Sequence, residues 1–134
     1  MPHSGTFAYP IDFNNVAGNQ VVIEIAPHRY VLYAHMRPGT VRVKVGQAVG
    51  GGDVIGHVGN TGSSSEPHLH MHIDSQPSFL AGNGVPYEFT SFGGSGPVEA
   101  TVTANSQRIT FGSIGPQKPF TNDYPAENAL VTFK

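Results

Sequence analysis

Three histidines occupy alternate positions in the segment PHLHMHID, residues 67–74: His68, His70 and His72. Successive side chains of a β-strand point to opposite faces, so an extended chain would place these three imidazoles on one face. The apolar residues between and after them would then share the other face and could cover a core. A helix would scatter both sets. The segment therefore predicts a strand that presents a row of imidazoles to one surface.

A row of this kind suits metal chemistry and proton transfer. Neighbouring histidines on one face of a strand lie about 7 Å apart. Neutral imidazole binds zinc, and it gains a proton near physiological pH, so one histidine can hold a metal while another transfers a proton. A polar strand face in contact with water would show the same pattern. The segment alone leaves both interpretations open.

The composition limits the kinds of site that the chain can hold. Its 134 residues suit one domain with a sizeable core and contain no cysteine, so a metal would have to be held by His, Asp or Glu. Charged residues make up only 12% and the formal net charge is -2, which argues against a nucleic-acid binder. No apolar run approaches the ~20 residues that span a membrane. The N-terminal residues lack the charged n-region and the apolar h-region of a signal peptide, so we expect none in this chain.

The elements that must position the histidines are expected to be strands. The chain has 17 glycines and 11 prolines, which divide it into short segments, as is typical of an all-β domain. No stretch shows a clean helical period with caps. We predict strands at residues 20–26, 30–36, 40–45, 67–74, 87–92, 98–104, 108–112 and 129–133, with one or two short strands within 48–59.

The domain organisation follows from one linker-like stretch. Residues 93–97, GGSGP, have the composition of a linker. We therefore predict a β domain over residues 1–92 and a C-terminal β extension over residues 93–134. About forty residues are marginal as an independent domain, so we expect the extension to pack on the same domain.

Five short motifs appear in the order of a known family: YAHM (33–36), VKVGQ (43–47), GDVIG (52–56), GNTG (59–62) and PHLH (67–70). In this order they resemble the lysostaphin/LytM-type zinc metallo-endopeptidases, which are peptidoglycan hydrolases. The resemblance covers roughly residues 18–75. Sugar-phosphotransferase carrier domains have a similar β architecture and also use paired histidines. They lack the combination of the GNTG motif with His-x-His, so this alternative ranks low.

The resemblance implies a compact antiparallel β-sheet or sandwich of the duplicated hybrid motif kind, with the site in a groove over the sheet. It implies that His70 is a zinc ligand and that His68 and His35 are catalytic. The implied activity is hydrolysis of a peptide bond in bacterial peptidoglycan, outside the cell or in the periplasm. Zinc lowers the pKa of a bound water, and a neighbouring imidazole can take its proton. We therefore expect His35 to lie on the same side of the sheet as His68 and His70.

One departure from the family concerns the metal. The family completes its zinc site with an upstream His-x-x-x-Asp motif, which this sequence lacks. Before Gly18 stand one histidine, His3, and one acidic residue, Asp12, nine positions apart. A catalytic zinc needs about three protein ligands, so His70 alone would bind weakly.

Three explanations are open. The chain can be part of a longer enzyme that carries the motif elsewhere. His3 and Asp12 can act as substitute ligands, although we favour ordinary loop residues. The chain can also be a non-catalytic relative that binds cell wall or a partner protein.

Other polar residues receive weaker predictions. His72 stands where the family often has Glu, and we expect a bystander, with a metal role left open. Asp53 and Asp74 flank the motifs and can orient imidazoles, although solvated loop carboxylates are the more frequent case. Tyr33 is expected to share a face with His35, two positions away.

Overall fold

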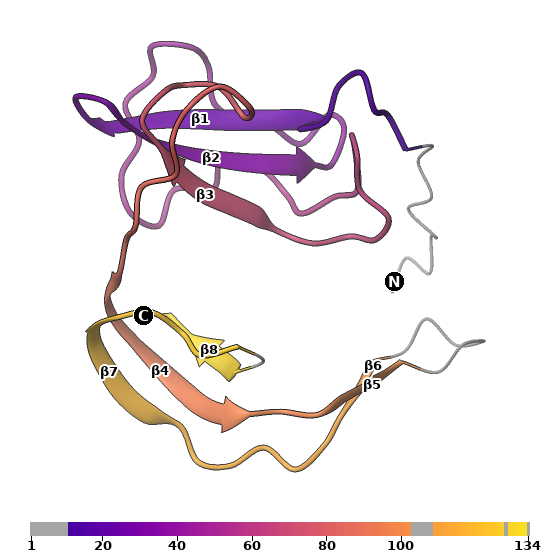
Figure 1. Cartoon of the computed structure of the whole chain (residues 1–134), viewed down its shortest axis with the longest axis vertical. Helices are drawn as coiled ribbons and strands as arrows, with labels where there is room; N and C mark the ends of the chain where they lie inside the picture. The colour runs from indigo at the N-terminus through magenta and orange to yellow at the C-terminus, as the bar shows by residue number, and fades with distance from the viewer. Residues whose placement is uncertain (1–10, 103–108, 128, 134) are drawn as a thin grey trace. The chain divides into compact units, whose positions relative to one another are not determined.

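The computed structural model describes residues 11–102, 109–127 and 129–133. The chain divides into two compact units between Pro86 and Tyr87. In Figure 1 the first unit carries β1–β3 and the second carries β4–β8. The predicted packing of the C-terminal segment on the first unit stays a prediction, as does the predicted border between residues 92 and 93.

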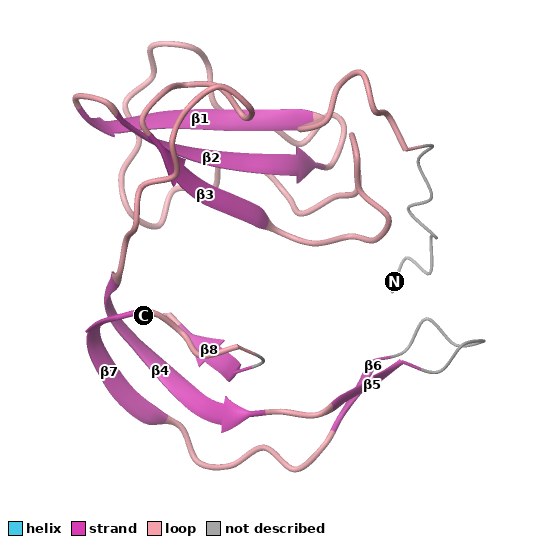
Figure 2. Cartoon of the chain, viewed as in Figure 1, coloured by secondary structure: helices cyan, strands magenta, loops and turns pink. Residues whose placement is uncertain are grey.

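All regular elements of the described residues are strands, as Figure 2 shows, and no helix there could cross a membrane. The predicted all-β class is confirmed. The strands pair antiparallel in three small sheets, with the orders β1-β2-β3, β7-β4-β8 and β5-β6. Their bounds are β1 Asn19–Ala26, β2 Arg29–Met36, β3 His70–Asp74, β4 Phe89–Pro97, β5 Ala100–Val102, β6 Ile109–Phe111, β7 Lys118–Asp123 and β8 Ala129–Thr132.

The sheet of the first unit is built on a predicted hairpin. Strands β1 and β2 match the segments 20–26 and 30–36, and Ala26 pairs with Arg29 across a two-residue turn. Leu32 is fully buried at the centre of this sheet. The other buried apolar residues in the described part of the first unit are Ala17, Val21, Val31, Ala34, Met36 and Ile73. Burial of these side chains provides the main favourable free energy of this small core.

Two predicted strands are absent. Residues 40–45 and 48–59 are irregular apart from an isolated bridge at Gly59, although the backbone N–H of Arg42 donates to the Ile55 carbonyl at 3.0 Å. The alternating valines of residues 40–45 do not form a buried face, since Val45 is fully exposed. Because no apolar face of these segments is buried, the sequence pattern alone does not stabilise a continuous ladder of strand hydrogen bonds.

The linker interpretation of residues 93–97 was wrong, because these residues form the second half of β4. Gly93 pairs with Pro119 of β7 and with Thr132 of β8. A side chain at Gly94 would press on the rings of Phe92 and Phe120, so glycine allows a close approach of these rings to the strand.

Strand β7 was not predicted. Strands β5 and β6 fall within the predicted segments 98–104 and 108–112, and residues 103–108 lie outside the described part of the chain.

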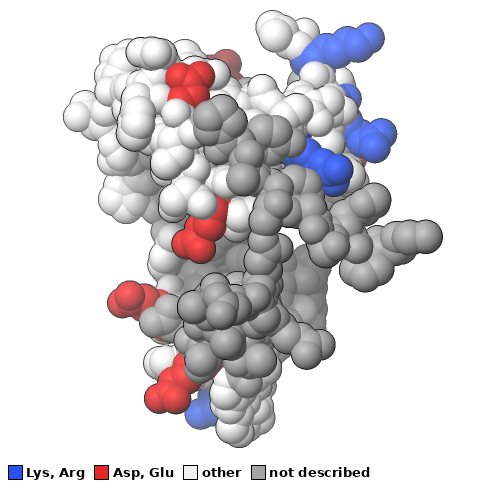
Figure 3. Space-filling view, turned by 90° about the vertical axis from the view of Figure 1, so that its right-hand side faces the viewer, with Lys and Arg blue, Asp and Glu red and all other residues white. Residues whose placement is uncertain are grey.

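Charged side chains are sparse on the surface. On the face shown in Figure 3, acidic side chains are scattered, several basic side chains gather at the upper right, and another basic side chain lies beside an acidic one low in the view. Most of the described surface between them is uncharged on this face.

Candidate metal and catalytic site

The register of β2 and β3 places two of the histidines. Ala34 pairs with His70 and Leu32 pairs with His72. Paired residues of antiparallel strands lie on the same face, so His70 and His72 share one face, as predicted. His68 precedes β3 and forms an isolated antiparallel bridge with Gly59. The row of histidines therefore begins in the loop and continues into the strand.

A β-bulge in β2 brings His35 to this face. Asn19 pairs with Met36 and Val21 with Tyr33, so Ala34 and His35 together lie opposite a single residue of β1. His35 has a φ of 59°, in the left-handed region that non-glycine residues rarely adopt. Regular alternation would point His35 away from His70, and the extra residue reverses this direction.

The expectation that Tyr33 shares a face with His35 was wrong for the same reason. Tyr33 pairs with Met71, which alternates with His70 along β3. Tyr33 therefore lies on the opposite face from the histidines. Burial raises the pKa of its phenol above the usual value.

The loop of the GNTG motif holds the bulge in place. The Thr61 hydroxyl donates to the Met36 carbonyl at 2.9 Å and accepts from the Asn19 backbone N–H at 3.0 Å. The His35 N–H donates to the Ala17 carbonyl at 2.8 Å. Gly18 approaches Thr61 so closely that any side chain at Gly18 would overlap it. The conformation of His35 is thus fixed by residues from two distant segments.

Backbone carbonyls set the tautomers of two histidines. The Nδ1 atom of His35 lies 2.7 Å from the Thr61 carbonyl oxygen, and the Nδ1 atom of His68 lies 2.8 Å from the Glu66 carbonyl oxygen. A carbonyl oxygen can only accept a hydrogen bond, so each Nδ1 carries the proton. In the neutral rings the Nε2 lone pairs are then free to bind a metal or a proton.

The polar loop before the histidine strand is itself ordered by buried groups. Ser64 and Asn60 are both buried and hydrogen-bonded to each other through their side chains. The Ser64 hydroxyl also lies 2.9 Å from the Glu66 carbonyl oxygen and 3.3 Å from Nδ1 of His68. The loop therefore positions the His68 ring, a role that its polar sequence did not reveal.

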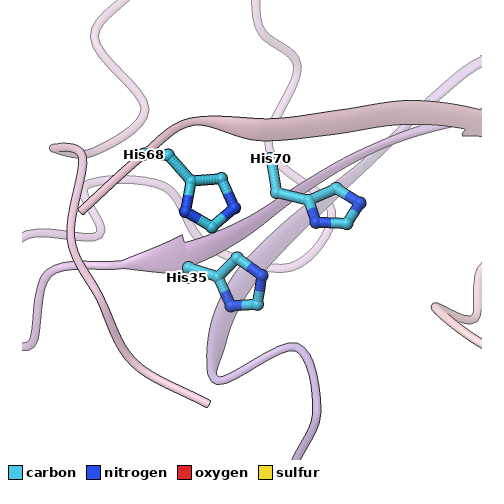
Figure 4. Close-up of side chains that lie close together, drawn as sticks. All are labelled: His35, His68 and His70. Atoms are coloured by element: carbon cyan, nitrogen blue, oxygen red, sulfur yellow. The ribbon is translucent and has the colours of Figure 1, made fainter. Parts of the chain in front are cut away.

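The three predicted site histidines converge. One ring nitrogen from each of His35, His68 and His70 lies within 4.8 Å of those of the other two. The ring centroids of His35 lie 4.9 Å from His68 and 5.2 Å from His70. Figure 4 shows the rings side by side, contributed by β2, by β3 and by the segment that leads into β3. The expected convergence is confirmed, while the separate roles of the three residues stay predictions.

The environment of His70 favours its neutral form. Burial lowers the pKa of His70, and the neighbouring rings of His35, His72 and His68 lower it further when they are charged. A neutral imidazole offers the lone pair that a metal ligand needs.

Three histidine nitrogens are a suitable type of ligand for zinc. Three neutral imidazoles with an open fourth position form a known type of catalytic zinc site. In such a site the ligand atoms lie about 3.4 Å apart, with each about 2.1 Å from the ion.

Of the two possible substitute ligands, Asp12 is not part of the cluster found among the described residues. Asp12 is exposed, and its Oδ1 accepts from the backbone N–H groups of Asn14 and Asn15 at 2.9 and 3.1 Å. Asp12 thus caps a turn, and the role of His3 lies outside the described residues. Asp53 accepts from the Gly50 N–H at 2.8 Å in an exposed turn.

One residue at the site was missed from the sequence. The ring of Phe79 lies 4.9 Å from His70, 5.2 Å from His72 and 6.1 Å from His35, measured between centroids. Phe79 comes from the loop after β3, in the segment QPSFLAG, which has no pattern that marks it. An aromatic residue a few positions after a histidine strand is the only sequence signal that could have drawn attention to it.

An all-β unit whose motif loop and bulge gather three imidazoles has the features of a metallopeptidase-type site. The comparison with known families agrees: peptidase family M23 matches residues 2–84, and the chain belongs to this family. The predicted lysostaphin/LytM-type resemblance is thereby confirmed, and the first unit is a peptidoglycan-hydrolase-like domain.

Three curated relatives illustrate this likeness. Endolysin 2638A of Staphylococcus phage 2638A is 32% identical over 75 residues, 55% of this chain and 15% of the endolysin. The DD-carboxypeptidase/endopeptidase Mpg of Neisseria meningitidis serogroup B is 45% identical over 67 residues, 45% of this chain and 14% of that protein. The peptidoglycan DD-endopeptidase ShyA of Vibrio cholerae serotype O1 is 36% identical over 88 residues, 54% of this chain and 20% of that protein. The chain thus spans a fifth or less of the length of these relatives, and no solved structure shows a significant match to it.

Proposed function

We propose that this chain is a zinc-dependent endopeptidase domain that hydrolyses peptide bonds in bacterial peptidoglycan. The observation that carries the proposal is the convergence of His35, His68 and His70, with ring nitrogens within 4.8 Å of one another. Family M23 membership and the activities for which Mpg and ShyA are named support the reaction class.

His70 is the proposed zinc ligand. It lies on β3, burial lowers its pKa, and its lone pair is therefore available at neutral pH. His35 and His68 are the nearest imidazoles to it in the cluster. When bound, zinc lowers the pKa of a water and polarises the carbonyl of the scissile bond.

His35 and His68 are the proposed proton-transfer residues. Their Nδ1 atoms are held by the carbonyls of Thr61 and Glu66, so Nε2 is the nitrogen of each ring that is left to take up a proton. One Nε2 can take a proton from the attacking water, and the other, once protonated, can give a proton to the leaving amine. Fixed carbonyl partners also stabilise an imidazolium that carries the extra proton.

The proposed substrate sets the proposed location. A peptidoglycan peptide is reached outside the cytoplasmic membrane, so we propose an extracellular or periplasmic site of action. The names of ShyA and Mpg support this class of substrate. The oligomeric state and the bond that is cut stay open.

A second candidate function is a non-catalytic module that binds cell wall or a partner protein. One observation favours it: the 134-residue sequence lacks the His-x-x-x-Asp motif that supplies two family ligands. Such a module would keep the fold and the histidine cluster without holding zinc tightly.

Metal analysis combined with a cleavage assay separates the two functions. The full chain is equilibrated with zinc, dialysed, analysed for metal and incubated with purified peptidoglycan. Close to one zinc per chain with released peptides, both lost in His70→Ala and kept in His57→Ala, supports the enzyme. His57 is a suitable control because its side chain is exposed and lies outside the cluster. Binding to peptidoglycan without zinc or cleavage supports the module.

A further inference from the structure

We propose that Phe79 is an additional substrate-contacting residue, which forms an aromatic wall beside the histidines and favours an aliphatic side chain next to the cleaved bond. The loop that carries it, residues 75–85, is called the Phe79 loop. We further propose that buried Asp74 is its positioning residue. The inference rests on the proposed function for its substrate class, but the position of the wall can be tested without any cleavage.

The contacts of Phe79 lead to a role at the reacting centre. Its ring meets the rings of His70, His72 and His35 edge-on, at interplanar angles of 60°, 64° and 70°. The side chain is only partly buried. An apolar ring that touches the imidazoles and keeps an exposed part faces whatever binds above them.

This placement predicts a preference in the substrate. A methyl group beside the scissile bond would bury apolar surface against the Phe79 ring, whereas glycine has no side chain to bury there. One methyl group in an apolar contact is worth about tenfold or more in selectivity. We therefore expect peptides with alanine beside the cleaved bond to be preferred over matched glycine peptides.

Asp74 fixes the start of the Phe79 loop. It is the last residue of β3, and only 5% of its surface is exposed. Its Oδ1 accepts from the Gln76 backbone N–H at 3.2 Å and from the Ser75 hydroxyl at 3.4 Å. Gly82 lies so close that a side chain there would overlap the Asp74 carboxylate. The carboxylate is thus enclosed between the two arms of the loop.

The end of the Phe79 loop returns to the same strand. The Ser75 N–H donates to the Asn83 carbonyl at 3.1 Å, and the Asn83 N–H donates to the Ser75 hydroxyl at 3.0 Å. The Val85 N–H donates to the Ile73 carbonyl at 2.8 Å. A loop whose two ends are bonded to one strand end is a compact Ω-type loop. Because that strand carries His70 and His72, the loop fixes Phe79 relative to both rings.

Two glycines of the loop give a matched pair of variants. Gly82→Ala places a methyl group against the Asp74 carboxylate, while Gly84→Ala places it in open space. Both add the same methyl group to the same loop. A structural change that appears in Gly82→Ala but not in Gly84→Ala is therefore due to packing against Asp74, and not to the loss of glycine flexibility in the loop.

The first test is structural and uses the metal-free full chain. Aromatic ring currents from Phe79 shift the ring proton resonances of His70 and His72. We expect these shifts to be lost in Phe79→Ala, reduced in Gly82→Ala and in Asp74→Ala, and close to wild type in Gly84→Ala. Asp74→Asn keeps an oxygen acceptor and should retain most of the shift. Wild-type shifts in both Gly82→Ala and Asp74→Ala would overturn the role of Asp74.

The second test is selectivity, measured as the ratio of kcat/KM for matched alanine and glycine peptides. We expect Phe79→Ala to reduce this ratio about tenfold and Phe79→Leu, which keeps an apolar side chain, to reduce it less. An unchanged ratio in folded Phe79→Ala would overturn the substrate contact. If the wild-type chain cleaves neither peptide, the proposed function fails while the ring-current result stands. Peptide-induced shifts at Phe79 in the wild type then confirm the contact, and their absence overturns it.

Discussion

The rings of His35 and His70 lie 5.2 Å apart between centroids, although regular strand alternation would place them on opposite faces of the sheet. The bulge at Ala34 and His35 reverses the direction of the His35 side chain, at the cost of a left-handed backbone with a φ of 59°. The site therefore depends on a strained position in β2 and on the segments that stabilise it.

Glycine should relieve this strain. His35→Ala and His35→Gly both remove the imidazole, but only glycine adopts a positive φ without steric penalty. We expect His35→Gly to be more stable than His35→Ala by about 1 kcal/mol, the reverse of the usual order within a strand. Urea denaturation of both variants measures the difference. Greater stability of His35→Ala would contradict the left-handed conformation.

The Thr61 hydroxyl should be needed to support the bulge. Thr61→Val keeps the shape of the side chain but leaves the Asn19 N–H and the Met36 carbonyl without this partner. Loss of partners for such partly buried groups costs about 1–3 kcal/mol, and we expect a decrease in the free energy of unfolding of this size. Thr61→Ser keeps the hydroxyl and serves as the control. Equal stability of the valine and serine variants would argue against a supporting role.

The metal-free chain should lose stability in acid through His70. The pKa of His70 is lowered in the folded state, mainly by burial, so the unfolded chain binds this proton more readily. The contribution of His70 to stability is therefore complete above about pH 6.5 and declines as the pH falls toward the lower folded pKa. Denaturation of the wild type and of His70→Gln across this range measures it. A steeper acid loss in His70→Gln than in the wild type would contradict the prediction.

The sequence was sufficient for those features that depend on local pattern. The hairpin of β1 and β2 and the shared face of His70 and His72 follow directly from alternation. The convergence of His35 was predicted from family resemblance, whereas its physical cause was not. That cause is the bulge, which is stabilised by Ala17 and Thr61. A residue's direction in a bulge depends on such distant partners, which alternation does not include.

The other incorrect predictions also arose because tertiary contacts, and not local pattern, decide the structure at these positions. Val45 continues a regular alternation yet is fully exposed, so the pattern does not correspond to a buried face. Gly93 and its neighbours have the composition of a linker, but pairing with β7 and β8 and close ring packing make them a strand. Phe79 carries no periodic signal and reaches the histidines only because Asp74 and the returning chain close its loop.

The most direct test of the central claim follows the histidine ring nitrogens of the metal-free full chain by NMR during titration with zinc. We predict that the signals of His35, His68 and His70 change together and reach a plateau near one zinc per chain. Calcium, which prefers oxygen ligands, should leave them unchanged. If zinc changes only signals of histidines outside the cluster, such as His28 or His57, or changes none, the cluster of His35, His68 and His70 does not hold a metal.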